Sequence, residues 1–383
     1  MDTTGILDEA LERLHRAGPE RLGRLTNHAP MAAEALVRHG RAASVHRWLD
    51  AYAPELEALP DPFAPVTHVD WQEALGDPRR AADWIAFFDR ELAARPWREV
   101  LAHWWPRLLP GLYGGSTHPV IRVGHAVRTL LDAGSEGDGG NGEDPGPRRT
   151  ELAHGLGYWA ARHHPVTGLT ATTGPTDPAD PTRPTTPAAS DAASDATARP
   201  LRGSSAAAAL DAVRPIDAQD GNFPTRLARV TGLPHWPAEP PAPEAARERL
   251  RELVRAATHR YLTHGHGEET MLVHAATAPN AVLRTLPALP PALWAPSLHA
   301  AWTASAAVTA MYAPRTSRIS RTSCTPLTPT TTLVPDSPTP AEVFERALAH
   351  GDEHVIKFTD TALDTADARS LRAALHAVHL TQT

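Results

Sequence analysis

Apolar residues recur every three or four positions along most of this chain, which is the spacing of one face of an α-helix. The pattern begins with Ile6, Leu7, Ala10, Leu11 and Leu14. It continues at 31–53, 80–94, 98–108, 118–132, 149–163, 244–263, 268–287, 292–312, 341–350 and 366–379. No segment shows the alternation of a convincing β-hairpin or the strand–helix–strand order of a βαβ unit. The sequence therefore predicts an all-α fold.

Three tracts break this periodicity, at 134–147, 170–204 and 314–339. They are rich in Gly, Pro, Ser, Thr or Asp and have little apolar surface to offset the entropy of ordering, so we interpret them as mobile loops or linkers. The chain then divides into an N-terminal helical part (1–133), a Gly/acidic loop (134–147), a helix (148–169), a Pro/Thr/Ala-rich linker (170–204) and a C-terminal helical part (205–383). Because candidate site residues lie on both sides of the linker, we expect a single large helical domain with long low-complexity insertions.

Charge and cysteine content exclude several classes of protein. The net charge is -7 and no run of Lys and Arg is present, so we expect no nucleic-acid partner. The single cysteine, Cys324, excludes disulfides within the chain and cysteine-based zinc sites.

The N-terminus lacks the features of a secretory signal, and the apolar stretch 289–313 is interrupted by prolines, which predicts a cytoplasmic protein without a membrane span. No GxGxxG motif indicates a tightly bound nicotinamide or flavin.

Several of the 21 histidines stand in apolar surroundings, where an imidazole needs a hydrogen-bond partner or a metal. His28 precedes Pro30 at the start of an apolar helix, where it is either a metal ligand or a helix cap. His118 and His125 are seven residues apart and share a helical face. His274 lies before an expected helix break at 277–279. For His118, His125 and His274, a core histidine bonded to a backbone carbonyl is an equally good interpretation. His15, His39, His46, His264 and His266 are expected to be solvated.

Lys357 is the one lysine among 37 Lys and Arg residues, and it lies three residues after His354. The two side chains are therefore neighbours on one helical face. A buried lysine has a lowered pKa, and its neutral amine can act as a base or nucleophile, or take up carbon dioxide to become a metal-binding carbamate. The alternative is an exposed lysine near Asp352 and Glu353.

Five segments of the chain resemble the questin oxidase-like family. They are NHAPMAAEAL (27–36), THPVIRVGHAVR (117–128), ELAHGLGYWAAR (151–162), HAATAPNAVLRTLPALP (274–290) and FERALAHGDEHVIKFTDTAL (344–363). The resemblance runs from about residue 20 to 379, apart from the low-complexity tracts.

The resemblance implies a non-haem iron oxygenase that opens a ring of an anthraquinone or another aromatic polyketide with dioxygen. It implies that His28, His118, His274, His354 and Lys357 bind the iron, with Lys357 carboxylated and with Lys357 and His354 also catalytic. His125 is a substitute candidate for His118. The implied partners are a small aromatic substrate and dioxygen, while the need for NADPH stays open.

Aromatic residues offered as walls of the substrate site are Trp104, Trp105, Tyr113, Trp159, Trp294 and Trp302. Two other functions remain open from the sequence. One is a His-rich metal-dependent hydrolase, in which the metal activates water. The other is a non-catalytic helical binding protein, in which the histidines are core residues.

Overall fold

The computed structural model describes residues 3–23, 25–136, 146–166, 204–238, 240–314 and 338–381. Helices form almost all of the regular structure in these residues, which confirms the predicted all-α fold. The longer helices are α1 (Thr3–Leu14), α2 (Ala29–Arg38), α3 (Val45–Tyr52), α5 (Ala81–Ala94), α6 (Trp97–Leu108), α7 (His118–Glu136), α8 (Gly146–Ala161), α11 (Pro243–His264), α13 (His274–Thr285), α14 (Trp294–Tyr312), α15 (Pro340–His350), α16 (Glu353–Thr365) and α17 (Ala368–Leu380). The short ones are α4 (Trp71–Ala74), α9 (Ala206–Asp211), α10 (Phe223–Leu227) and α12 (Glu269–Leu272).

A small antiparallel sheet, which the sequence did not predict, lies near the N-terminus. Its strands are β1 (Ala17–Arg21), β2 (Leu25–Thr26) and β3 (Leu56–Ala58), in the order β2-β1-β3. The strands are two to five residues long, too short for an alternating pattern to stand out. Their pairing ties the segment before α2 to the segment after α3.

Two predicted helices are each divided in the structure. The segment 31–53 forms α2 and α3, separated at Gly40, whose positive φ of 73° ends the first helix. The segment 268–287 forms α12 and α13, so the helix break falls at Val273, immediately before His274. The expected break at 277–279 is therefore wrong, because Pro279 lies inside α13.

The predicted loop at 134–147 is shorter than expected, because α7 continues to Glu136 and α8 begins at Gly146. The rest of that loop, at 137–145, lies outside the described residues, as do 170–203 of the predicted linker and 315–337 with Cys324.

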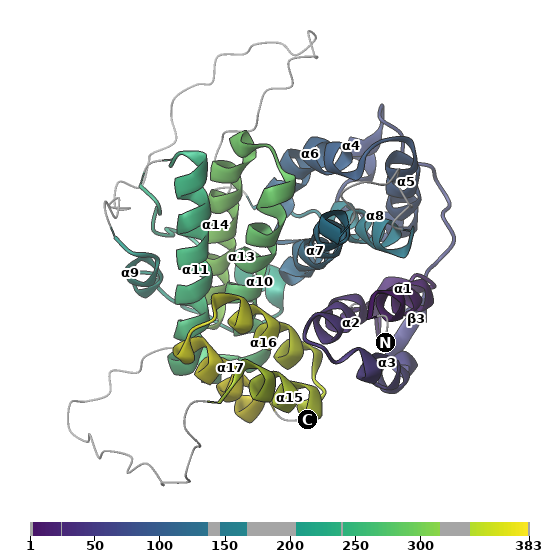
Figure 1. The fold of residues 1–383 in the computed structure, drawn as a ribbon. Coiled ribbons are helices and arrows are strands. Elements are labelled where there is room, and N and C mark those ends of the chain that lie inside the picture. Colours follow the sequence, from purple (N-terminus) through teal and green to yellow (C-terminus); the bar gives the residue numbers. More distant parts are fainter. Residues whose placement is uncertain are drawn as a thin grey trace, which may run out of the picture.

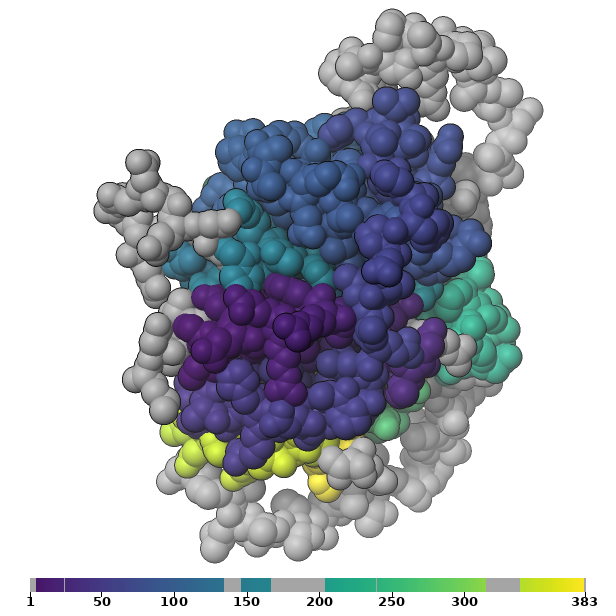
Figure 2. Space-filling view, turned by 90° about the vertical axis from the view of Figure 1, so that its right-hand side faces the viewer, coloured from purple at the N-terminus to yellow at the C-terminus, as the bar shows by residue number. Residues whose placement is uncertain are grey.

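Four helices from both halves of the sequence form a closed ring. α2 contacts α7, α7 contacts α13, α13 contacts α16, and α16 contacts α2. In Figure 1 the purple α2 lies beside the yellow α16 near the opposite end of the chain. Figure 2 shows the N-terminal segment in purple lying between the blue helical region and the yellow C-terminal residues. Segments far apart in sequence therefore meet around one centre.

The largest apolar cluster surrounds α7, α8, α13 and α14 and contains the buried rings of Trp84, Trp104, Trp105, Trp159 and Trp302. This core packs against one side of the helix ring and holds α7 and α13 in contact. Within the described residues, no helix has both the length and the apolar character needed to cross a bilayer.

Candidate metal centre

The structure brings His28, His118, His274, His354 and Lys357 to the same end of the four-helix ring. The ring centroids of His28 lie 4.6 Å from His118 and 4.5 Å from His354, and those of His118 and His274 are 4.4 Å apart. His274 and His354 are 5.7 Å apart. All five residues are buried or nearly so, and they come from α2, α7, α13 and α16.

Each histidine stands where its helix begins. His28 is the N-cap of α2, His118 and His274 are the first residues of α7 and α13, and His354 is the second residue of α16. The positive ends of four helix dipoles thus face the cluster, which disfavours a protonated imidazole. The sequence could show that each histidine starts a helix, but not that the four starts meet.

The imidazoles are held in the neutral form that binds metals. Burial and the nearby Lys357 amine together lower the pKa of His118 to about 3, although the hydrogen bond to the Gly115 carbonyl opposes the shift. Burial also lowers the pKa of His28, His274 and His354 well below the usual value, again with a contribution from Lys357. At neutral pH each ring therefore offers a nitrogen lone pair.

Many nitrogen atoms in this cluster have no hydrogen-bond partner among the described residues. They are both ring nitrogens of His28 and His274, Nε2 of His118 and Nζ of Lys357. His28 Nδ1 lies 3.1 Å from Glu353 Oε1, but outside hydrogen-bond geometry. Buried polar atoms without a partner are rare in proteins and require an explanation. A metal ion bound by one nitrogen of each ring is such an explanation for part of this set, since imidazoles suit first-row transition metals.

His118 shows the arrangement that is typical of a metal ligand. Its Nδ1 lies 2.7 Å from the carbonyl oxygen of Gly115, so Nδ1 carries the proton and donates, which leaves Nε2 free to bind. Gly115 begins the turn before it with a φ of 55°, which glycine adopts without strain. Ser116 and Thr117 follow with φ values of 56° and 69°, which are strained for residues with a side chain. Such conformations cost roughly 1–3 kcal/mol each and concentrate at functional sites. Here they place the Gly115 carbonyl beneath the imidazole.

Lys357 is not the exposed lysine of the alternative interpretation, because only 1% of it is accessible to solvent. Burial lowers the pKa of its amine to about 7, although Glu353 and Asp352 oppose the shift. The amine is therefore about half neutral near pH 7, and its neutral fraction grows as the pH rises. It lies one helical turn from His354 on α16, as the spacing predicted.

Two residues beside the cluster were missed by the sequence analysis. Glu353 Oε1 lies 3.9 Å from His354 Nδ1, in addition to its approach to His28, and accepts a hydrogen bond of 2.7 Å from Arg21 Nη2. In the sequence, the position of Glu353 directly before His354 could have indicated that it lies beside the cluster. No sequence signal indicated Arg21, because it reaches the site only through the pairing of β1 with its neighbouring strands.

His125, the substitute for His118, does not join the cluster. Its Nδ1 lies 2.7 Å from Glu34 Oε2, two helical turns farther along α7. The expectation that His39 is solvated is also wrong, because its Nε2 lies 2.9 Å from the buried Asp360 Oδ1. Glu34, His125 and Asp360 lie close together, but the guanidinium of Arg128 contacts both carboxylates and already supplies the positive charge that a metal ion would bring.

The aromatic residues offered as substrate walls are used in packing. Trp104 lies among Trp71, Trp84, Phe87 and Phe88, with ring centroids 5.2–5.7 Å away. Trp105 packs edge-on against Trp159, and Trp302 packs against Trp236. Among the described residues, no ring contact joins any of the proposed wall residues to the four clustered histidines.

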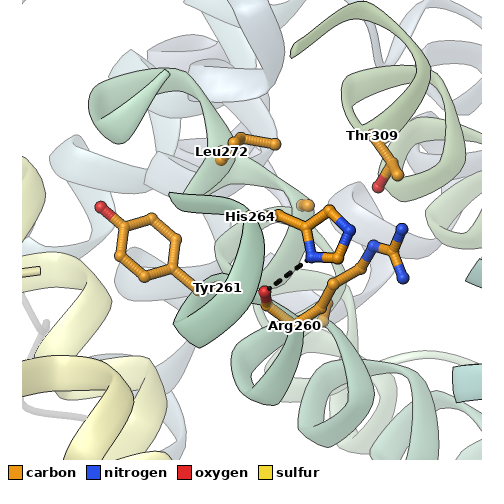
Figure 3. Close-up of a pocket in the computed structure, with 7 residues that line it drawn as sticks. Arg260, Tyr261, His264, Leu272 and Thr309 are labelled. Carbon is orange, nitrogen blue, oxygen red and sulfur yellow. Dashed lines mark hydrogen bonds between the residues drawn. The ribbon is translucent and has the colours of Figure 1, made fainter. Parts of the chain in front are cut away.

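A separate pocket lies between α11, α12, α13 and α14 (Figure 3). Arg260, Tyr261, His264, Leu272 and Thr309 line it, and His264 Nδ1 lies 3.3 Å from the carbonyl oxygen of Arg260. None of the clustered histidines lines this pocket. His264 is the one histidine that lines this pocket, so the described residues around it offer no cluster of imidazoles comparable to the metal centre.

A mainly helical protein with a buried cluster of histidines and one lysine has the side chains of a candidate metalloprotein. Residues 25–133 match the questin oxidase-like family model, which confirms the family resemblance over that segment. His28 and His118 lie inside the matched segment, whereas His274, His354 and Lys357 lie beyond it. The family name points to an oxidase-like enzyme, and hence to an oxidoreductase. No curated protein and no solved structure matches the chain.

Proposed function

We propose that this protein is a non-haem iron-dependent oxygenase that cleaves a ring of an anthraquinone or a related aromatic polyketide. The observation that carries the proposal is the buried set of nitrogen atoms without partners on His28, His118, His274 and Lys357, with His354 beside them. The questin oxidase-like match supports the choice of oxidation over other metal chemistry. Bound iron would supply the redox centre at which dioxygen reacts.

Lys357 is proposed to bind as a carbamate. Its neutral Nζ attacks the carbon of carbon dioxide, a C–N bond forms, and one N–H proton is released to solvent. The product is an anionic oxygen ligand, which partly offsets the charge of a divalent ion among neutral imidazoles. A neutral amine at pH 7 is the condition for this step, and burial of Lys357 supports it.

The residues around the ligands have positioning roles in this proposal. The Gly115 carbonyl fixes the tautomer of His118, and Glu353 faces the Nδ1 atoms of His28 and His354. Arg21 balances the charge of Glu353. Carboxylates and carbonyls beside histidine ligands orient the rings and raise their basicity.

The first test is elemental analysis of protein purified without oxygen, compared with His274→Asn and His154→Asn. Both histidines are buried, and each has an unpartnered ring nitrogen, but His154 lies on α8 away from the cluster. We expect stoichiometric iron in the parent protein and in His154→Asn, and its loss in His274→Asn. Equal metal content in all three proteins would contradict the site.

The second test is dioxygen consumption by the iron-loaded protein with an anthraquinone. Incorporation of both oxygen atoms needs no external reductant, whereas incorporation of one atom, with the other released as water, consumes two electrons from a donor such as NADPH. Substrate-dependent oxygen uptake supports the oxygenase. Turnover without oxygen, with zinc or manganese bound, would instead identify a metal-dependent hydrolase.

A further inference from the structure

The four helices that carry the candidate ligands are joined a second time, farther along their length. The second contact, which we name the ionic layer, consists of Glu34 on α2, His125 and Arg128 on α7, Arg284 on α13, and Asp360 and Asp364 on α16. These residues follow the clustered histidine of their own helix by six to ten positions. That spacing corresponds to roughly 9–15 Å along a helix axis.

Arg128 lies at the centre of the ionic layer. Its Nε donates to Glu34 Oε1 at 2.8 Å, and its Nη2 donates to Asp360 Oδ2 at 3.0 Å. Arg128 therefore joins α7 to both α2 and α16. Arg284 extends the layer to α13, since its Nη2 donates to Asp360 Oδ2 at 2.7 Å and its Nε to Asp364 Oδ2 at 2.8 Å.

The buried carboxylates of the ionic layer are held in the ionised form by the arginines. Burial opposes ionisation of Glu34, but Arg128 and His125 outweigh it and lower the pKa of its carboxyl group to about 2. Burial likewise opposes ionisation of Asp360, and Arg128 and Arg284 hold its pKa well below the usual value. A buried pair of this kind adds little stability compared with apolar packing, and in some proteins its fixed geometry instead specifies one arrangement of the helices.

We propose that the ionic layer positions the metal centre by fixing the relative depth and rotation of α2, α7, α13 and α16, so that their four histidines meet at one point. This inference rests on the proposed metal site. Glu34, Arg128, Arg284 and Asp360 are positioning residues in it, because the hydrogen bonds and ion pairs among the described residues join them to one another and to none of the candidate ligands. A shift of one helix against another by a fraction of an ångström would change ligand geometry at the ring end.

The chain provides a closely matched control for this proposal in Glu151 on α8. Like Glu34, Glu151 is 4% exposed, and it accepts two hydrogen bonds from an arginine of α7, Arg122, at 2.6 and 2.8 Å. It also has a histidine beside it, and its pKa is lowered to about 2, with Arg122 outweighing the effect of burial. The difference is that α8 carries none of the candidate ligands.

The experiment is titration of metal-free parent, Glu34→Gln and Glu151→Gln proteins with Co²⁺, read by visible absorption, with circular dichroism confirming the fold. We expect both variants to lose stability, but only Glu34→Gln to lose Co²⁺ affinity, by about 10-fold or more, with an altered absorption spectrum. If Glu34→Gln does not fold, Arg284→Gln provides the same comparison at the edge of the layer.

The possible failures are distinguishable. Parent-like Co²⁺ affinity in Glu34→Gln, or an equal loss in Glu151→Gln, overturns the positioning role and leaves the metal site intact. A parent protein that binds neither Co²⁺ nor iron overturns the metal site and the positioning role together.

Discussion

Replacing Lys357 by methionine should stabilise the metal-free protein. Methionine keeps the length of the side chain and removes the buried amine, which has no partner among the described residues. Burial lowers the pKa of the amine from 10.5 to about 7. The pKa difference of 3.5 units corresponds to about 5 kcal/mol of folding free energy. Below pH 7 folding is disfavoured by this amount, because the buried site binds the proton much more weakly than the unfolded chain does. We expect Lys357→Met to recover a large part of this free energy.

The pH dependence of this gain has a definite sign. Below about pH 7 Lys357 is protonated in both folded and unfolded chains, and its full destabilising effect is present. Between pH 7 and 10.5 only the unfolded chain binds the proton, so the effect fades as the pH rises. The stability difference between Lys357→Met and the parent protein should therefore shrink over this range.

The assay is urea unfolding of chelator-treated proteins from pH 6 to about 10.5, followed by circular dichroism. Lys357→Arg is the matched variant, because guanidinium stays protonated. It should bind no metal, keep most of the helicity and gain no stability. A metal-free Lys357→Met protein that is less stable than the parent at pH 7 would refute the reasoning, since it would mean that the amine is well satisfied in the fold.

Three further outcomes follow from particular positions. Acidification from pH 4.5 to about 2 should destabilise the protein by about 3 kcal/mol for each of Glu34 and Glu151, because both carboxylates become protonated. In denaturant unfolding, Glu34→Gln and Glu151→Gln should each show a weaker pH dependence of stability than the parent protein. Gly124→Ala should lower the free energy of unfolding by about 2 kcal/mol in the same assay, because its Cβ would lie 2.6 Å from the Cα and Cβ of Ala281 where α7 meets α13. Unchanged stability would mean that the two helices separate freely. Ala366→Gly should raise the thermal midpoint with a gain of up to about 1 kcal/mol, since Ala366 ends α16 with a φ of 53°, and a loss of stability would contradict that backbone conformation.

Helix content was predictable because it depends on local spacing. Periodic apolar residues identified most segments, and local side chains also mark helix starts, as Thr339 and Glu342 do in the capping box before α15. The short sheet at β1 was not predictable, since its strands gain stability only from partners elsewhere in the chain. The division of 31–53 depended on the backbone conformation of Gly40, which the apolar pattern alone does not reveal.

The sequence by itself determined which side chains were candidates for chemistry: a single lysine one turn from His354, and four further histidines in apolar surroundings, His28, His118, His125 and His274. Only the tertiary structure decided that four of the five histidines meet Lys357, that His125 pairs with Glu34 instead, and that Arg21 and Glu353 stand beside the cluster. Helical spacing places residues of one helix on a common face. It carries no information about how far one helix lies along another, and buried contacts such as those of Arg128 and Gly124 set that distance.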